Sequence, residues 1–389
     1  MNFADDQFMQ LSCDRTTKIF VIAVAFICVT FVFYEQNLGY PHFIDAPLRL
    51  KSFFDSSFLE NDQQLITDRS KLILAWNPFF SYDLAKVFTE RGLKNCKYRC
   101  TATNNRSQLA AAEVVVFHIR NTSPKDLPHS RSRHQLFAFF LQESPYHTGG
   151  VLNYLPRDYF NITMSYRLDS DVHAGYGRLR VIDNLTASEE AWKWEDVVKI
   201  VKSKTKSVLS IVSNCNTESK REYYTRILAK YIKITEFGRC PNRTCDAECA
   251  ERAVAQHHFY LAFENSVCRD YVTEKAFDRM EKIIVPVVLK RSIASSLLPN
   301  GSFIAADDFD SPASLAAYMQ HLETNKKEYL KYFDWTKIYK KRTYENYGCD
   351  LCSFLHEKPN KSLIIKDIKN WWFGHNICVN DYAMLLLGN

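Results

Sequence analysis

The chain has 389 residues, more than one hydrophobic core usually supports, so two domains with additional tails are expected. Its net charge of +6 is spread among 44 acidic residues instead of being concentrated in one basic block. Nucleic acid is therefore not expected as a partner.

An apolar segment near the N-terminus predicts a membrane anchor. Residues 19–34 carry no charge and follow Arg15 and Lys18, which favours a cytoplasmic tail over residues 1–18. The run is shorter than the ~20 residues of an average spanning helix, but it fits a thin early-secretory bilayer. A cleaved signal peptide is the alternative, although no small-residue cleavage pattern follows promptly. We expect a single-pass type II anchor and then a stem over residues 35–69.

Cysteines and glycosylation triplets favour an oxidising lumen. Of the 12 cysteines, two lie before or within the anchor, which leaves ten that could form disulfides. Zinc is the alternative, because Cys349 and Cys352 have CxxC spacing and Cys245 and Cys249 a wider one, but no zinc-finger histidine pattern accompanies them. Triplets of the N-x-Ser/Thr type begin at Asn105, Asn121, Asn161, Asn184, Asn242, Asn300 and Asn360.

Alternating strand and helix signals over residues 70–190 predict an α/β domain. Strand-like apolar runs occur at residues 72–76, 114–118 and 136–141. Glu143 follows the third run, where a strand would end at the mouth of the domain, and Pro145 fixes the turn. From the residues alone, Glu143 is a surface glutamate at a strand end.

A second alternating series over residues 191–346 predicts another α/β domain. Its strands are expected at residues 208–212, 232–237, 259–263 and 285–289. Residues 347–389 are expected to return across the domain interface, because the sequence DIKNWWF is too aromatic for a free tail.

The segment 259–275, FYLAFENSVCRDYVTEK, passes from a strand-like run through polar residues into a helical pattern. Asp270 can cap a helix whose first turn carries Thr273, Glu274 and Lys275. Free backbone N–H groups and a lysine ammonium would then meet one anion, which suits a diphosphate. An ordinary strand, loop and capped helix is the alternative.

FENS followed by DYVTEK closely resembles the signature of the α1,3/4-fucosyltransferases, glycosyltransferase family 10, which transfer fucose from GDP-fucose to GlcNAc-containing glycans. Further support comes from the sequences MSYRLDSD, SNC with Arg221 downstream, VPVVL and GSFIAADDF. The resemblance covers about residues 70–375. It implies a GT-B-like fold, in which two Rossmann-like α/β domains face each other across a cleft.

The resemblance implies an inverting reaction, because GDP-fucose carries its sugar in the β configuration and the family makes α-linked fucose. Such a transfer needs a base for the acceptor hydroxyl and cations for the departing diphosphate. Glu143 is the candidate base, because ESP resembles the family segment with the catalytic carboxylate. The candidate donor-binding residues are Arg221 and Lys275 for the diphosphate, Glu274 for the ribose, and Asn265 and Tyr271 as neutral contacts. The role of Glu264 stays open.

Asp169 and Asp171 have the DxD spelling of metal-dependent transferases, but the resemblance implies no metal site here. We expect no required cofactor and at most stimulation by Mn²⁺, because arginine and lysine can neutralise the diphosphate.

Two further expectations follow from the resemblance. C-terminal cysteines of the family tie back to the N-terminal domain, so Cys96 and Cys100 are candidate partners of Cys349 and Cys352, with the connectivity open. Lys290 and Arg291 stand where many relatives have a glycine and a tight turn, so the loop there should differ in shape if it lies over the nucleotide.

The leading hypothesis is a Golgi α1,3-fucosyltransferase that acts on GlcNAc of glycoprotein N-glycans, in an antenna or at the core. Its partners would be GDP-fucose, a glycoprotein glycan and the Golgi membrane. The alternatives are an inactive glycan- or nucleotide-binding relative and a GT-B enzyme that uses another nucleotide sugar.

Overall fold

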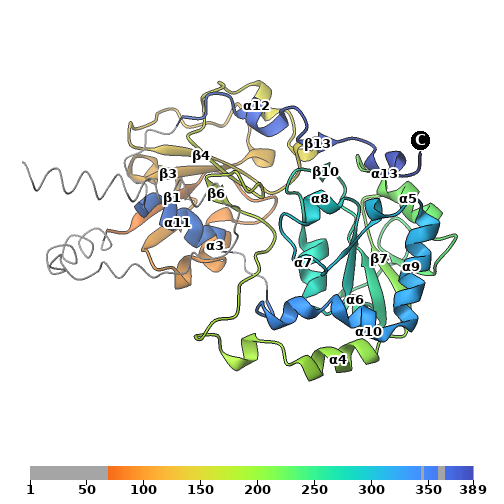
Figure 1. Ribbon diagram of the computed structural model, residues 1–389. Coiled ribbons are helices and arrows are strands. Elements are labelled where there is room, and N and C mark those ends of the chain that lie inside the picture. The colour runs from red at the N-terminus through yellow and green to blue at the C-terminus, as the bar shows by residue number, and fades with distance from the viewer. Residues whose placement is uncertain (1–68, 343–345, 358–363, 389) are drawn as a thin grey trace, which may run out of the picture. The chain divides into compact units, whose positions relative to one another are not determined.

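The computed structural model describes residues 69–342, 346–357 and 364–388 (Figure 1). The predicted anchor and nearly all of the predicted stem lie outside these residues. In the three described ranges, no helix combines the length and the apolar character that crossing a bilayer requires.

The first sheet has six parallel strands in the order β2-β1-β3-β4-β5-β6. Its strands are β1 Lys71–Ala75, β2 Cys100–Thr103, β3 Val114–His118, β4 Leu136–Leu141, β5 Ile162–Ser165 and β6 Val172–His173. All of β3 and nearly all of β4 are buried, as expected for parallel strands that are covered on both faces. The three predicted strands of this region are confirmed.

The second sheet has five parallel strands in the order β12-β11-β9-β7-β8. Its strands are β7 Lys206–Ile211, β8 Ile234–Phe237, β9 His257–Leu261, β11 Val285–Val288 and β12 Ile304–Ala305. The four predicted strands are present, although β7 and β9 begin two residues earlier than expected. A short antiparallel pair joins β10 Val267–Cys268 to β13 Cys378–Val379.

The α-helices are α3 Leu84–Glu90, α4 Trp194–Lys202, α5 Arg221–Leu228, α6 Ala247–Gln256, α7 Glu274–Met280, α8 Arg291–Ala294, α9 Pro312–Thr324, α10 Lys326–Lys331, α11 Tyr347–Glu357, α12 Ile368–Phe373 and α13 Tyr382–Leu385. Figure 1 shows α5 and α9 on one side of the second sheet and α7 on the other.

The elements after Tyr347 supply part of the core of the first sheet. Successive residues of a strand face opposite sides, so Val115 and Val116 belong to different cores. Trp372 of α12 is fully buried in the core that contains Val115. Leu351 of α11 is fully buried in the core that contains Val116. Both faces of the first sheet therefore depend on segments from the C-terminal part of the chain.

The two sheets share one strand order, and this order locates the binding edge. In each sheet the order reverses between the first and third strands, which are β1 and β3 in one and β7 and β9 in the other. Ligands of open parallel sheets bind outside the carboxyl ends of the strands at such a reversal. A ligand site is therefore expected at the loops after β7 and β9.

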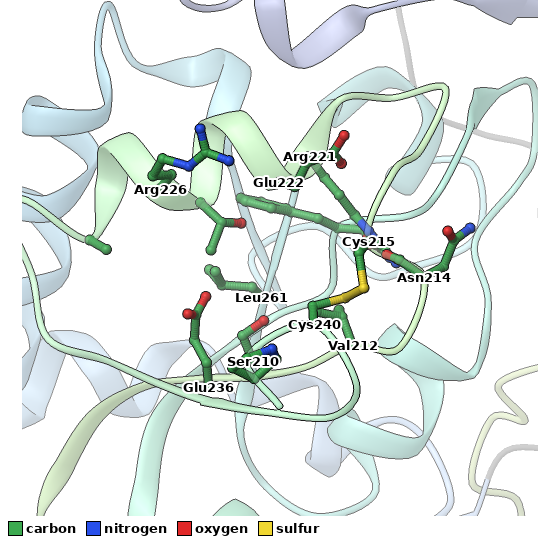
Figure 2. Close-up of a pocket in the computed structure, with 14 residues that line it drawn as sticks. Ser210, Val212, Asn214, Cys215, Arg221, Glu222, Arg226, Glu236, Cys240 and Leu261 are labelled. Carbon is green, nitrogen blue, oxygen red and sulfur yellow. Dashed lines mark hydrogen bonds between the residues drawn. A yellow bond between two sulfur atoms is a disulfide. The ribbon is translucent and has the colours of Figure 1, made fainter. Parts of the chain in front are cut away.

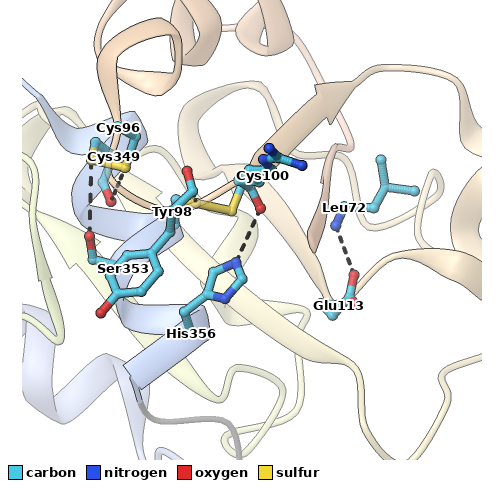
Figure 3. Close-up of a disulfide and its surroundings, with 10 residues drawn as sticks. Leu72, Cys96, Tyr98, Cys100, Glu113, Cys349, Ser353 and His356 are labelled. Atoms are coloured by element: carbon cyan, nitrogen blue, oxygen red, sulfur yellow. Dashed lines mark hydrogen bonds between the residues drawn. A yellow bond between two sulfur atoms is a disulfide. The ribbon is translucent and has the colours of Figure 1, made fainter. Parts of the chain in front are cut away.

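All ten cysteines downstream of the predicted anchor form disulfides. Cys96 is bonded to Cys349 and Cys100 to Cys352, the partners that the resemblance implied (Figure 3). The other pairs are Cys215–Cys240, Cys245–Cys249 and Cys268–Cys378. The alternative of zinc at Cys349 and Cys352, or at Cys245 and Cys249, is contradicted because these sulfurs are bonded to other sulfurs.

The glycosylation triplets differ in exposure. The asparagines at positions 105, 121, 184, 242 and 300 are exposed, and Asn360 lies outside the described residues. Asn161 is only 9% exposed, and its side-chain oxygen accepts a hydrogen bond of 2.7 Å from the backbone N–H of Phe137. The folded chain therefore uses the side-chain oxygen of Asn161 to hold the start of β4, and glycosylation of Asn161 stays a prediction.

Candidate active site

Arg221 lies at the reversal point of the second sheet. It is the first residue of α5 and is only 5% exposed. Its guanidinium donates to the carbonyl oxygens of Phe263, at 2.6 Å, and Asn214, at 3.2 Å. These carbonyls belong to the loops after β9 and β7. Burial lowers the pKa of Arg221 and the nearby Glu264 carboxylate opposes this effect, so a charged group is fixed where the two loops meet.

Lys275 is held in the first turn of α7 by two carboxylates. Its Nζ lies 3.1 Å from Oε2 of Glu264 and 3.1 Å from Oε1 of Glu274, and it donates to Oγ1 of Thr273 at 3.0 Å. Burial alone would lower the pKa of Lys275, but the two carboxylates raise it. Lys275 therefore stays protonated. It lies next to Glu264, the same carboxylate that opposes the effect of burial on the pKa of Arg221.

The start of α7 differs from the prediction in two respects. Thr273 caps the helix, with its Oγ1 accepting from the backbone N–H of Lys275 at 3.4 Å. Asp270 has a φ of 60°, and its carboxylate instead accepts from the backbone N–H of Leu168 at 3.1 Å. The helix start is also not free for an external anion, because Oε1 of Glu264 accepts from both N and Oγ1 of Thr273 at 2.8 Å.

Glu264 therefore has a role that the sequence left open. Its carboxylate joins the end of β9 to the start of α7 and also pairs with Lys275. Burial raises the pKa of Glu264, while the Lys275 ammonium opposes this rise. The sequence shows only that Glu264 stands between a buried strand and a capped helix. Its contacts with Thr273 and Lys275 are apparent only from the structure.

Asn265 and Tyr271 lie on the loop between Glu264 and α7. The carbonyl of Asn265 accepts from the backbone N–H of Ser219 at 3.0 Å. Its side-chain Oδ1 is buried and has no hydrogen-bond partner among the described residues, so it is available to a ligand hydroxyl. The ring of Tyr271 packs edge-on against Tyr166 at 4.8 Å, and burial raises the pKa of Tyr271, with smaller contributions from Tyr176 and Glu143.

Glu143 lies two residues beyond β4, as predicted, and its side chain is 22% exposed. The nearest cation is Arg120, whose Nη1 lies 3.9 Å from Oε2 of Glu143. Arg120 follows β3, the neighbour of β4 in the sheet, and also covers the ring of Phe80 at 5.7 Å. No sequence pattern singled out Arg120.

Two contacts connect the segment after β4 to the loops of the second sheet. The hydroxyls of Ser144 and Ser266 lie 2.8 Å apart, and both residues are fully buried. Nε2 of His147 lies 3.5 Å from Oε2 of Glu218. Because Ser144 follows Glu143 and Ser266 follows Asn265, the structure brings the candidate base to the candidate donor residues.

The carboxylates of the DxD sequence serve other residues of the chain. Asp169 accepts from Arg167 at 2.6 Å and lies 3.4 Å from Arg269. Asp171 accepts from the backbone N–H and the hydroxyl of Thr163 at 2.8 Å. These carboxylates hold the ends of β5 and the loop after it.

The loop at Lys290 and Arg291 is fixed by its own contacts. Nζ of Lys290 lies 3.1 Å from the hydroxyl of Tyr382 in α13, and Nε of Arg291 donates to Asp308 at 2.6 Å. Lys290 has a φ of −128°, which any residue adopts, so this position does not need a glycine.

A cavity of about 330 Å³ lies beside Arg221, between α5 and the carboxyl ends of β7 and β8 (Figure 2). Its lining includes Val212 and Leu261, the disulfide between Cys215 and Cys240, and Glu236 of β8. The sequence did not predict this cavity, because it depends on how far α5 lies from the edge strand.

Two models of protein families match this chain. The model of "Fucosyltransferase, N-terminal" matches residues 68–177, and that of "Glycosyltransferase family 10 (fucosyltransferase) C-term" matches residues 201–371. The chain is 32% identical to alpha-(1,3)-fucosyltransferase C of Drosophila melanogaster, over 94% of this chain and 91% of the relative. It is 34% identical to human alpha-(1,3)-fucosyltransferase 7, over 77% and 85%.

A solved structure shares the fold. The crystal structure of an alpha1,3-fucosyltransferase with GDP-fucose has a TM-score of 0.50 and 15% identity, over 77% of this chain and 92% of the other. The family models together span most of the chain, and the two relatives are matched over 91% and 85% of their length. The chain therefore belongs to glycosyltransferase family 10, the fucosyltransferase family.

Proposed function

We propose that this chain transfers fucose from GDP-fucose to a GlcNAc hydroxyl of glycoprotein N-glycans, forming an α1,3 linkage with inversion. The proposal rests on two cations at the carboxyl edge of the second sheet, the buried Arg221 and Lys275, whose side chain is 20% exposed. The Ser144–Ser266 contact joins the loops of this edge to the segment of Glu143. The relatives named above are α1,3-fucosyltransferases, and the similar solved structure contains GDP-fucose.

The donor would lie across the loops after β7 and β9, with the two α/β halves facing each other as in a GT-B enzyme. Arg221 offers a planar fork and Lys275 a point charge to the two phosphates. Lys275 would exchange part of its contact with Glu264 and Glu274 for phosphate oxygens. The half-exposed carboxylate of Glu274 suits the ribose hydroxyls, and the unpartnered Oδ1 of Asn265 suits another donor hydroxyl.

Glu143 would remove the proton of the acceptor hydroxyl. The acceptor oxygen then bonds to C1 of fucose while the bond from C1 to the phosphate oxygen breaks on the opposite face, which inverts the configuration. Nη1 of Arg120 lies 3.9 Å from Oε2 of Glu143, so Arg120 can help to orient this carboxylate. The fixed charges of Arg221 and Lys275 stabilise the negative charge that grows on the departing diphosphate.

We further propose that the reaction takes place in the Golgi lumen, with residues 19–34 as a type II anchor. The five disulfides and the exposed glycosylation triplets support an oxidising, glycosylating compartment.

The test uses the full-length chain with a panel of nucleotide sugars and defined N-glycans, and identifies products by mass and linkage. GDP-fucose is expected to give an α1,3-fucosylated product. Products that lack fucose would contradict the proposal, and a fucose at another position would contradict the α1,3 linkage.

Glu143→Gln tests the proposed base. A positioned base contributes on the order of 100- to 10,000-fold, so turnover should fall by that factor while the affinity for GDP is retained. The exposed residue Glu195 provides the control, because Glu195→Gln should leave turnover unchanged. Near-normal turnover of Glu143→Gln would remove this residue from the mechanism.

A further inference from the structure

The C-terminal part of the chain contributes one tyrosine to the carboxyl edge of the second sheet. The hydroxyl oxygen of Tyr382, in α13, lies 3.1 Å from Nζ of Lys290, shortly after β11, and 3.0 Å from Oδ2 of Asp307, shortly after β12. An ammonium only donates and a carboxylate only accepts, so Lys290 donates to Tyr382 and Tyr382 donates to Asp307. Burial raises the pKa of Tyr382, with a smaller contribution from Asp307, so the hydroxyl keeps the proton that it donates.

The backbone of Tyr382 is fixed on both sides. The backbone N–H of the preceding residue, Asp381, donates to the carbonyl of Glu218 at 2.8 Å. The backbone N–H of the following residue, Ala383, donates to the carbonyl of Ser219 at 2.9 Å. Because Glu218 and Ser219 belong to the loop after β7, Tyr382 is attached to the loop that leads into α5.

A disulfide attaches the same segment to the loop after β9. The short strand β13 pairs with β10, and the bond between Cys268 and Cys378 joins the two strands. The backbone N–H of Arg269 also donates to the carbonyl of Ile377 at 2.7 Å. Two loops of the carboxyl edge therefore hold this segment, which leaves the side chain of Tyr382 little freedom to move.

Lys290 borders the candidate donor site and, within the described ranges of the chain, makes no ion pair. It lines a small cavity together with Glu264 and Tyr271, between the carboxyl ends of β9 and β11. Glu264 is the carboxylate that pairs with Lys275, so this cavity adjoins the first turn of α7. Nζ of Lys290 lies 4.5 Å from the centre of the Tyr382 ring. An ammonium has three N–H donors, so the bond to the Tyr382 hydroxyl leaves others for a ligand.

A lysine whose partner is neutral suits an anion. Lysine binds phosphate as a point charge, and the Tyr382 hydroxyl brings no negative charge that would compete for the ammonium. Lys275, in contrast, already lies beside two carboxylates. Position 290 is also one at which this chain departs from the family resemblance, so a contact from Lys290 would be additional to those of Arg221 and Lys275.

We propose that Lys290 is a third cation for the diphosphate of the donor, and that Tyr382 is the residue that positions it. The inference rests on the proposed function, because it adds a contact to the nucleotide that the enzyme would use. Tyr382 does not touch the donor. It donates its proton to Asp307, which leaves its oxygen lone pairs to hold the Lys290 ammonium at the edge of the sheet.

The test measures the affinity of the full-length chain for GDP by calorimetry, in wild type, Lys290→Met, Tyr382→Phe and the double variant. Lys290→Met should weaken binding of GDP about tenfold, because a hydrogen bond from a charged group is lost. Tyr382→Phe should weaken it roughly 3- to 10-fold, because the ammonium loses its fixed position. The double variant should bind GDP as weakly as Lys290→Met alone, because Tyr382 acts through Lys290.

Denaturation of the same four proteins separates positioning from a purely structural role. Tyr382→Phe should lower the free energy of unfolding with or without Lys290, because the bond to Asp307 is lost in both backgrounds. It should lower the affinity for GDP only where Lys290 is present. The matched controls are the exposed residues Tyr231 and Lys199, because Tyr231→Phe and Lys199→Met remove the same groups and should keep the wild-type affinity.

Each outcome decides one part of the proposal. If the wild-type chain binds GDP and Lys290→Met binds it equally well, the inference is wrong while the proposed function stands. If Tyr382→Phe leaves the affinity for GDP unchanged, or lowers it equally in both backgrounds, Tyr382 does not position Lys290. If the wild-type chain does not bind GDP, the proposed function itself fails.

Discussion

Replacing Lys275 by methionine tests whether the cation of α7 has separate structural and donor-binding roles. Its ammonium lies 3.1 Å from Glu264, and the side chains of Lys275 and Glu264 are 20% and 11% exposed. Removing one partner of a buried pair costs about 3–5 kcal/mol. Glu264 keeps its two hydrogen bonds from Thr273, so we expect the low end, about 3 kcal/mol of unfolding free energy. Glu274 is 47% exposed, so its pair with Lys275 adds at most about 1 kcal/mol.

The second change is Glu264→Gln in the same protein. The glutamine can still accept from Thr273 but carries no charge, so Lys275→Met/Glu264→Gln should regain stability to within about 1 kcal/mol of wild type. Affinity for GDP should stay about 10- to 100-fold weaker in both variants, because the ammonium is missing in each. The effect of Lys275 on stability would thus be distinguished from its effect on the affinity for GDP.

Chemical denaturation gives the unfolding free energies, and calorimetry gives the affinities for GDP. The control is Lys282→Met, which breaks an exposed pair with Glu251 of 2.8 Å and should cost less than about 1 kcal/mol. A loss below 1 kcal/mol for Lys275→Met would refute the reasoning, as would a double variant that is no more stable than the single one.

Three other predictions concern pH, a buried hydroxyl pair and metal. Burial lowers the pKa of His118 from 6.5 to about 4, so between these values the unfolded chain binds a proton that the folded chain does not, and stability falls as the pH falls. This effect of His118 lowers the free energy of unfolding by about 3 kcal/mol between pH 6.5 and 4. Denaturation at both pH values should show this contribution in wild type but not in His118→Gln. Ser266→Ala should lower the free energy of unfolding by about 1–2 kcal/mol, because it leaves the buried hydroxyl of Ser144 unpaired. In denaturation experiments, the double variant Ser144→Ala/Ser266→Ala should be closer in stability to wild type. An equal loss of stability in both variants would contradict this prediction. Excess EDTA should leave most fucosyl transfer intact in a product assay, because Arg221 and Lys275 neutralise the diphosphate, and a complete loss that Mn²⁺ restores would overturn this view.

Four of the seven strands that the sequence predicted share one physical property. The strands β3, β4, β9 and β11 are almost completely buried, so their sequences are continuous apolar runs. Among the missed strands, β6 and β12 have two residues each, and β2 is partly exposed with two threonines. Their pairing depends on neighbouring strands more than on their own residues.

The candidate site was only partly predictable for a related reason. A family resemblance identifies residues that match a motif, and it led to Glu143, Arg221 and Lys275. It does not reveal that Thr273 caps α7, while the carboxylate of Asp270 accepts from the backbone N–H of Leu168. It also cannot show that Glu264 occupies the helix start, because this property depends on distances across the fold.

The position of α11 affects the order in which the protein can mature during synthesis. Residues 71–173 supply every strand of the first sheet, yet Leu351 and Phe354 complete one of its cores, and Cys349 and Cys352 close its disulfides across separations of 253 and 252 residues. Apolar surface of the first sheet must therefore stay uncovered while the second sheet emerges from the ribosome. The core and the two disulfides of the half that is made first can therefore be completed only after the C-terminal part has been translated.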